Sequence, residues 1–154
     1  MQVFIDADGC PVVRIAADIC SKHGIPVTLV CDTSHRFSNI NAEVITVDKG
    51  ADSADMKLVN LISCGDIVIT QDYGLAAMCL ARNGICISQD GLIYDSSNID
   101  SLLFSRHVAK KIRRSGGKLK GPHKRTADDD KEFSQKFEGL IESIKYRKKV
   151  KYEH

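Results

Sequence analysis

The sequence predicts an α/β protein in which helices cover both faces of a mainly parallel, five-stranded sheet, a three-layer α/β/α arrangement. Short apolar runs rich in β-branched residues alternate with segments of helical periodicity as far as residue 88. This alternation is typical of right-handed βαβ units. With 154 residues, of which 43% are hydrophobic and 27% charged, the chain suits a single domain, residues 1–154, built on one core.

The strands are identified as compact apolar runs bounded by turn residues. The predicted strands are residues 3–5, 26–30, 43–47, 67–70 and 85–88, followed by a short extended piece within 90–95. Asp66 precedes the fourth strand instead of following it. We therefore interpret Asp66 as a turn residue at the opposite rim of the sheet from the other acids discussed below.

The helices are identified by apolar residues that recur every three or four positions. The predicted helices are residues 11–23, 53–63, 73–82, 99–114 and 128–149. The last one carries Phe133 and Phe137 on one stripe and begins with three aspartates, which favour the positive end of the helix dipole. We expect the C-terminal helices to pack on the α/β core, with a basic loop at 118–127 and a frayed tail at 150–154.

Composition excludes several classes of protein. No apolar run approaches the ~20 residues that a membrane span requires. The N-terminus has neither a basic region nor a small-residue cleavage site, so we expect a cytoplasmic protein. Six cysteines are scattered along the chain without a C-x-x-C pair, which favours buried, reduced thiols over disulfides or a zinc site.

The net charge of +2 hides a strong asymmetry. Residues 1–105 carry 6 Lys and Arg against 13 Asp and Glu, a balance of −7, whereas residues 106–154 carry 16 against 7, a balance of +9. An acidic region suits divalent cations and a basic one suits phosphates. A metal-dependent enzyme that acts on a polyanion fits both, and attraction between two solvated surfaces explains the same pattern.

Five aspartates are predicted at one rim of the sheet, where the carboxyl ends of its strands lie. They are Asp6 and Asp8 after the first strand, Asp52 and Asp55 after the third, and Asp72 after the fourth. In parallel sheets, ligands bind beyond these strand ends. Carboxylates gathered there repel one another unless a cation neutralises them, and Mg²⁺ or Mn²⁺ prefers such oxygens. The sequence therefore predicts a metal site.

The same aspartates have ordinary structural explanations. Asp52 and Asp55 stand at a helix start and would cap that helix, and Asp72 is a natural N-cap for the next one. Asp8 precedes a glycine and suits a turn. Asp6 directly follows an apolar strand, so a purely structural role explains it least well. The joint occurrence of the five carries more information than any one of them.

The D-x-D-G sequence at residues 6–9 also resembles the first motif of haloacid-dehalogenase-type phosphohydrolases. In that family the first aspartate, here Asp6, attacks phosphorus, and the second, here Asp8, acts as acid and base. The order of the later motifs argues against this resemblance, because the chain offers no acidic pair after a strand in its C-terminal part. A small-molecule phosphohydrolase that uses Asp6 is therefore the less favoured alternative.

Four sequence blocks together resemble the bacterial YaiI/YqxD-like family of uncharacterised proteins. The blocks are VFIDADGCPV at 3–12, DKGADSAD at 48–55, GDIVITQDYGLA at 65–76 and GPHKRTADDDKEF at 121–133. The TQDYGLAA segment, with the first aspartate and the acidic helix start, is also similar to PIN-like nuclease domains.

The resemblance to PIN-like domains implies a site and a reaction. It assigns Asp6, Asp55 and Asp72 as catalytic metal-binding acids, with Asp8 and Asp52 as further metal ligands nearby. It implies Mg²⁺ or Mn²⁺ as the cofactor, because in PIN-like nucleases such ions activate a water toward a phosphodiester.

The basic loop is the predicted contact with a nucleic acid. Its candidate phosphate-binding residues are Lys118, Lys120, Lys124 and Arg125. A solvated loop without a ligand is the ordinary alternative. The sequence thus favours a metal-dependent nuclease acting on RNA or single-stranded nucleic acid, with a non-catalytic nucleic-acid or protein binding module as the alternative, and it leaves the oligomeric state open.

Overall fold

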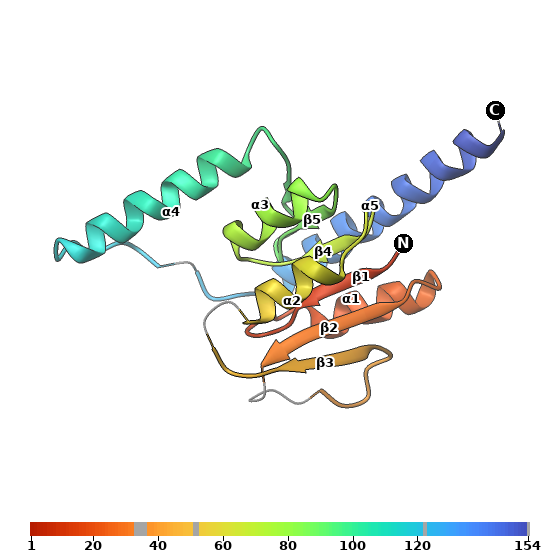
Figure 1. Ribbon diagram of the computed structural model, residues 1–154, viewed down its shortest axis with the longest axis horizontal. Coiled ribbons are helices and arrows are strands. Elements are labelled where there is room, and N and C mark those ends of the chain that lie inside the picture. The colour runs from red at the N-terminus through yellow and green to blue at the C-terminus, as the bar shows by residue number, and fades with distance from the viewer. Residues whose placement is uncertain (33–36, 51–52, 122, 154) are drawn as a thin grey trace.

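The computed structural model describes residues 1–154 apart from 33–36, 51–52, 122 and 154 (Figure 1). The elements are β1 (Val3–Asp6), α1 (Val13–Lys22), β2 (Val27–Asp32), β3 (Glu43–Val47), α2 (Ser53–Leu61), β4 (Ile67–Ile69), α3 (Tyr73–Ala81), β5 (Ile85–Ile87), β6 (Ile93–Tyr94), α4 (Ile99–Arg114) and α5 (Ala127–Glu153). The strands form one six-stranded sheet in the order β3-β2-β1-β4-β5-β6. The first five strands are parallel, and β6, which lies within the predicted extended piece, pairs antiparallel with β5. The predicted α/β class with a mainly parallel sheet is confirmed.

The core lies on both faces of the sheet, and β1 contributes to both. Successive side chains of a strand point to opposite faces. Val3 and Ile5 accordingly contact the core beneath α1 and α5, while Phe4 contacts the core beneath α2 and α3. All three are nearly or fully buried, so the three-layer order follows from this alternation.

Helix α5 packs on the α1 side of the sheet, as the sequence predicts. Its apolar stripe of Phe133, Phe137, Ile141 and Ile144 is buried. The rings of Phe133 and Phe137 stack with centroids 5.3 Å apart. Burial of one such side chain stabilises the fold by about 1.5–3 kcal/mol. The helix continues to Glu153, beyond the predicted end at residue 149, so residues 150–153 extend it.

Helix α4 packs on the core only through its first turns. Ile99 is buried, and Leu102 and Leu103 pack beside it against α3 and its neighbours. Beyond them the helix projects away from the sheet (Figure 1). Among the helices of the described residues, none is both long and apolar enough to cross a membrane.

All six cysteines are free thiols. The buried ones are Cys20, Cys31, Cys79 and Cys86, whereas Cys10 is half-buried and Cys64 is exposed. Burial raises the pKa of Cys20 to about 12, so this thiol stays protonated and packs as a small hydrophobic group. The prediction of buried, unpaired thiols is therefore confirmed for four of the six.

The two edges of the sheet are chemically different. At the amino edge, the carboxylate of Asp66 accepts hydrogen bonds from the backbone N–H of Gln2 at 3.0 Å and of Ser63 at 2.8 Å. This confirms Asp66 as a turn residue. At the carboxyl edge, the chain leaves β1 toward β2 on one side and leaves β4 toward β5 on the other. Parallel sheets bind ligands at such a switch point.

Candidate metal site at the carboxyl edge of the sheet

Asp6 and Asp72 are joined through the side chain of Thr70. Asp6 ends β1, and Thr70 directly follows the adjacent strand β4. The Thr70 hydroxyl donates a hydrogen bond to Oδ2 of Asp6 at 2.8 Å. Its oxygen accepts one from the backbone N–H of Asp72 at 3.0 Å. Because Thr70 is only 2% exposed, the bridge is shielded from water and holds the two aspartates as neighbours.

The surroundings of Asp6 disfavour its ionised form. Burial is the main effect and raises the pKa of Asp6 above its ordinary value. The hydrogen bond from Thr70 lowers the pKa by favouring the carboxylate, and the charges of Asp72 and Asp8 raise it again. A cation placed among these carboxylates would relieve their repulsion.

Asp72 is the N-cap of α3. Its Oδ1 accepts hydrogen bonds from the backbone N–H of Gly74 at 2.9 Å and of Leu75 at 3.3 Å. The capping role that the sequence suggested for Asp72 is therefore confirmed. The same oxygen also accepts a hydrogen bond from Nη1 of Arg106 in α4, at 3.2 Å. This ion pair connects helix α4 to the carboxyl edge.

Asp8 ties the loop after β1 to the end of β2. Its two carboxylate oxygens accept hydrogen bonds from the backbone N–H of Asp32, at 3.0 and 3.3 Å. Gly9 follows with φ at +70°, a conformation that residues with a Cβ rarely adopt, and turns the chain toward α1. Asp8 consequently stands between the ends of β1 and β2.

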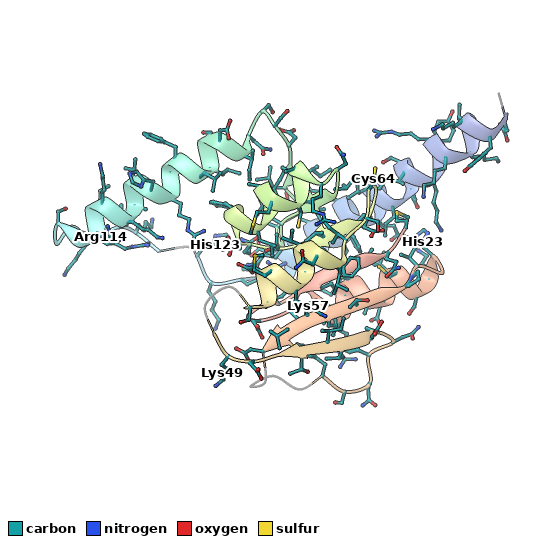
Figure 2. The ribbon with its side chains drawn as sticks, viewed as in Figure 1. His23, Lys49, Lys57, Cys64, Arg114 and His123 are labelled. Carbon is teal, nitrogen blue, oxygen red and sulfur yellow. The ribbon has the colours of Figure 1, made fainter. Side chains whose placement is uncertain are left out.

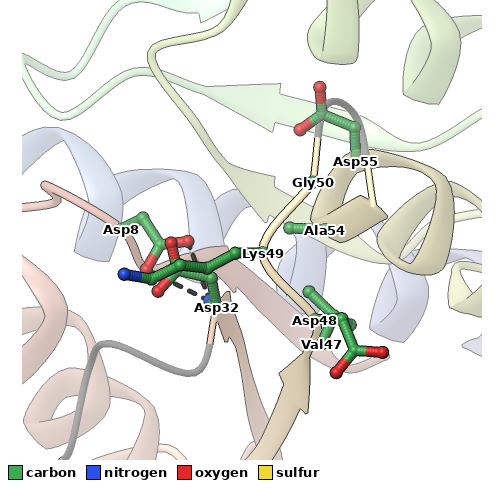
Figure 3. A pocket seen from close by; sticks show the side chains of 8 residues that line it. All are labelled: Asp8, Asp32, Val47, Asp48, Lys49, Gly50, Ala54 and Asp55. Atoms are coloured by element: carbon green, nitrogen blue, oxygen red, sulfur yellow. Dashed lines mark hydrogen bonds between the residues drawn. The ribbon is translucent and has the colours of Figure 1, made fainter.

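Two hollows lie along this edge, and Asp8 lines both of them. The smaller has a volume of about 220 Å³ and includes Asp6 and Thr70. The larger has a volume of about 390 Å³ and includes Asp55 (Figure 3). The other lining residues are Gly9, Cys10, Ile69, Gln71 and Gln89 in the smaller hollow, and Asp32, Val47, Asp48, Lys49, Gly50 and Ala54 in the larger.

Asp55 lines the larger hollow, whereas Asp6 lines the smaller one. Asp55 lies in the first turn of α2 and lines the larger hollow on a different side from Asp8 and Asp32 (Figure 3). Asp52 lies outside the described residues. The predicted acids therefore fall into two neighbouring groups, with Asp6, Asp8 and Asp72 at the β1–β4 switch point and Asp55 at the adjoining hollow.

The oxygens at this edge suit a hard divalent cation. Mg²⁺ typically takes one or two protein carboxylates and keeps several waters, and Mn²⁺ also prefers oxygen ligands. Within the described part of the chain, no three of these carboxylates have oxygens within 4.8 Å of one another. An ion at this edge would therefore contact one or two of them directly and reach the others through water.

A tight cluster of metal-ligand types occurs elsewhere, where α1 meets α5. His23, Glu138 and Glu142 have ligand atoms within 4.8 Å of one another, far from Lys49 at the carboxyl edge (Figure 2). Lys22 Nζ lies 2.6 Å from Oε1 of Glu138, and His23 Nε2 lies 3.1 Å from the same oxygen. This ammonium group opposes cation binding, so the cluster fastens α5 to α1.

The four predicted nucleic-acid-binding residues differ in their surroundings. The exposed ones are Lys118, Lys120 and Lys124. Arg125 is instead paired, with Nε 2.6 Å from Oδ1 of Asp130, Nη1 3.1 Å from Oδ1 of Asp90 and Nη2 3.0 Å from the carbonyl oxygen of Gln89. Because Gln89 lines the smaller hollow, Arg125 anchors the basic loop beside it and the three lysines remain its exposed cations.

A protein-family model matches almost the entire chain. Residues 4–143 match the family described as "Uncharacterized BCR, YaiI/YqxD family". The chain belongs to the YaiI/YqxD family. The matched range contains all the predicted site residues.

The alignments with YaiI/YqxD relatives cover nearly the whole length of this chain and of each relative. A UPF0178 protein of Exiguobacterium sibiricum is 50% identical over 141 residues, 92% of this chain and 96% of that protein. A UPF0178 protein of Clostridium acetobutylicum is 46% identical over 143 residues, 92% and 97% of the two chains. One of Clostridium tetani is 44% identical over 149 residues, 97% and 100%. No solved structure matches the chain.

This YaiI/YqxD chain has further acids at the edge that the sequence predictions missed. Asp32 and Asp48 line the larger hollow together with Lys49. The signal was present, because Asp32 ends β2 as Asp6 ends β1, and Asp48 directly follows β3. Applying the same strand-end rule to every strand identifies both residues.

Two other residues of the site were also missed, for different reasons. Thr70 follows the fourth strand and was readable as a strand-end residue, but a threonine there is normally taken as part of the strand. Arg106 reaches Asp72 from another helix. Only the tertiary packing of α4 brings Arg106 and Asp72 together, so no local sequence signal could have identified Arg106.

Proposed function

We propose that this protein is a divalent-metal-dependent phosphodiesterase with a PIN-like domain, acting on RNA or single-stranded nucleic acid. The observation that carries the proposal is the Thr70 bridge, which holds Asp6 beside Asp72 at the switch point between β1 and β4. A half-buried carboxylate whose pKa is raised by desolvation and by neighbouring charges is typical of functional sites.

In the proposed site, some residues of the carboxyl edge would bind the ion and others orient those ligands. Asp6, Asp8 and Asp72 would hold Mg²⁺ or Mn²⁺, and the chemistry such an ion supplies when bound is activation of a water and stabilisation of charge on a phosphodiester. Thr70 orients Asp6, and the hydrogen bonds of the α3 N-cap orient Asp72. Side chains held in this way lose little freedom on binding an ion.

The remaining predicted ligands belong to the adjoining hollow. The PIN-like pattern assigns both Asp52 and Asp55 to the site, and Asp55 lines the hollow that shares Asp8 with the smaller one. A second ion, or a water network from the first, would connect Asp55 to Asp8.

The distribution of charge supports a polyanionic substrate. The acidic edge belongs to the part of the chain with a balance of −7, and the part that follows has a balance of +9. The exposed lysines Lys118, Lys120 and Lys124 follow α4 and precede the anchor at Arg125. Exposed lysines bind phosphates without reading the base sequence, which suits a substrate defined by its backbone.

A specific observation favours the non-catalytic alternative. Oδ1 of Asp72 already accepts hydrogen bonds from Gly74, Leu75 and Arg106. A carboxylate satisfied in this way has a structural purpose without any metal. In that case the protein binds a nucleic acid or another protein through its basic surface and does not cleave.

A cleavage assay separates the two functions. Labelled RNA and single-stranded DNA are incubated with Mg²⁺ or Mn²⁺ and either the parent protein or the Asp6→Asn variant. We expect the variant to lose more than about 100-fold in rate, since a direct ligand matters at least as much as a residue that supports one. Asp18→Asn is the matched control, because Asp18 is exposed on α1 and its replacement removes the same charge.

Each other outcome has a distinct meaning. Equal cleavage by Asp6→Asn and the parent contradicts the proposed metal site. Salt-sensitive binding without cleavage by any form indicates the binding module. Hydrolysis of p-nitrophenyl phosphate with a phosphorylated Asp6 indicates the small-molecule phosphohydrolase.

A further inference from the structure

One face of helix α4 leads from the core of the protein to the acidic edge. Ile99 is buried on this face, and Leu102 and Leu103 pack beside it. Residues three and four apart lie on the same side of a helix. Arg106 continues the face by one more turn, and its guanidinium reaches Oδ1 of Asp72 at 3.2 Å. The face that packs on the body is therefore also the face that meets the site.

The same face continues as a basic stripe beyond the body. Lys110, Arg113 and Arg114 follow Arg106 by four, seven and eight residues, which is the spacing of one side of a helix. All three are exposed, and within the described residues none of them has an acidic partner. Arg114 lies at the outer tip of the helix, and His123 lies closer to the body where the chain returns (Figure 2).

The segment that carries the stripe is uniformly basic. Residues 101–127 contain nine Lys and Arg and no Asp or Glu. The like charges of such a projecting segment repel one another, and a bound polyanion would relieve this repulsion. Its charge is thus complementary to a phosphate backbone.

We propose that Arg106, Lys110, Arg113 and Arg114, the α4 track, bind the phosphate backbone of single-stranded nucleic acid and lead it to the acidic edge. This inference rests on the proposed function, for which it names the path of the substrate. Arg106 stands at the junction, and a phosphate that reaches it replaces Asp72 as the partner of its guanidinium. Oδ1 of Asp72 then has one donor fewer and faces the proposed ion.

The geometry favours a strand of nucleic acid over a membrane surface. The track lies on the face of α4 that turns toward the body, as the contact of Arg106 with Asp72 shows. A flat bilayer approaching that face would meet the rest of the protein first. The apolar side chains of α4, Phe104 at 68% exposure and Val108 at 36%, fall on the opposite face by the same helical spacing. A single strand is thin and flexible enough to follow the track.

Binding measured without metal tests the track. The full-length protein is titrated into a labelled single-stranded RNA of mixed sequence in EDTA, and fluorescence anisotropy is followed at several salt concentrations. The variant Lys110→Gln/Arg113→Gln/Arg114→Gln should weaken binding at least about tenfold and reduce the slope of log K against log salt by about 2, since three phosphate contacts are lost.

A second projecting basic segment provides the matched control. The variant Arg147→Gln/Lys148→Gln/Lys149→Gln removes the same charge from exposed residues near the end of α5. The α4 track predicts that this control keeps nearly all of its affinity and its salt slope. Equal losses in both variants, or no loss in the α4 variant, would overturn the proposal. Loss of binding to phosphatidylserine vesicles with unchanged RNA binding would overturn it in favour of a membrane surface.

The same variants separate this inference from the proposed function. If the parent protein binds RNA through the track but never cleaves it, the track stands and the phosphodiesterase fails. If the parent cleaves RNA and the α4 variant cleaves with an unchanged KM, the phosphodiesterase stands and the track fails.

Discussion

Asp6 and Asp66 are carboxylates at opposite edges of the same sheet, and they are held in different ways. Asp66, at 7% exposure, accepts hydrogen bonds from two backbone N–H groups. Asp6 has the hydroxyl of Thr70 as its one donor among the described residues, and the charges of Asp72 and Asp8 act on it.

The difference teaches how to tell a structural acid from a functional one in this fold. A buried carboxylate that receives two backbone hydrogen bonds is satisfied by the protein and stabilises the turn that supplies them. A half-buried carboxylate with one hydroxyl donor and two charged neighbours is costly as it stands. Groups with perturbed pKa values cluster at functional sites, and this supports the proposed metal site at Asp6.

The largest expected effect is on the structural acid. Asp66→Ala removes the buried carboxylate that accepts hydrogen bonds from the backbone N–H groups of Gln2 and Ser63. Because hydrogen bonds to a charged group are the stronger kind, their loss should cost about 2–5 kcal/mol in the free energy of unfolding. Urea denaturation followed by circular dichroism measures this cost. Asp66→Asn keeps one acceptor oxygen and should lose less. A stability unchanged by Asp66→Ala would show that these hydrogen bonds do not hold the amino edge.

The next effect concerns metal binding at the other edge. Mn²⁺ at 100 times its dissociation constant should stabilise the parent protein by about 2.7 kcal/mol, because the ion binds only the folded state. EDTA should reverse the shift in melting temperature, and Asp6→Asn should abolish it. Asp66→Asn serves as the comparison and should keep the shift relative to its own baseline. An equal shift in Asp6→Asn would place the ion away from the switch point.

The comparison becomes sharper when the single donor of Asp6 is removed. Thr70→Val removes both the hydrogen bond to the Asp6 carboxylate and the acceptor for the backbone N–H of Asp72. This loss should lower the free energy of unfolding by about 1–2 kcal/mol. Since that hydrogen bond lowers the pKa of Asp6, its loss should raise this pKa further. Stabilisation by Mn²⁺ should then begin at a higher pH than in the parent. Thr70→Ser keeps the hydroxyl and should restore the parent profile; failure to do so would show that packing, not the hydroxyl, matters.

The smallest expected effect is the dependence of stability on pH. Folding raises the pKa of Asp6 above its ordinary value of 3.8, so the folded state binds this proton more tightly than the unfolded state does. Stability is therefore lost as the pH rises through the raised pKa. Asp6→Asn cannot ionise and should melt at a higher temperature than the metal-free parent at pH 7. The gap should close as the pH falls toward 3.8, and a gap of the opposite sign would contradict the burial of Asp6.

Much of the fold could be predicted because its signals are local. The apolar run at residues 3–5 and the similar runs later in the chain predict strands, and the stripe of Phe133 and Phe137 predicts a packed helix. The short antiparallel β6 was harder, since a two-residue strand depends on its neighbour β5 more than on its own sequence. The projection of α4 could not be predicted, because its periodicity alone does not reveal that packing ends near Leu103.

Only those residues of the candidate site that follow the end of a strand could be predicted from the sequence. Asp6 and Asp72 could be placed together because Asp6 ends β1 and Asp72 follows β4. These two strands are adjacent and parallel, so their carboxyl ends lie side by side. The place of Asp55 in the larger hollow depends on the exact position of α2. The ion pairs of Arg106 and Arg125 depend on tertiary contacts between distant segments, so composition could show only that these residues are basic.

The most direct test is the anomalous density of a crystal soaked in Mn²⁺. We predict a peak at the carboxyl edge of the sheet, between the carboxylates of Asp6 and Asp72 and within reach of Asp8. A peak at His23, Glu138 and Glu142 instead, or no peak at the carboxyl edge in fully soaked crystals, would contradict the metal site on which the proposed function depends.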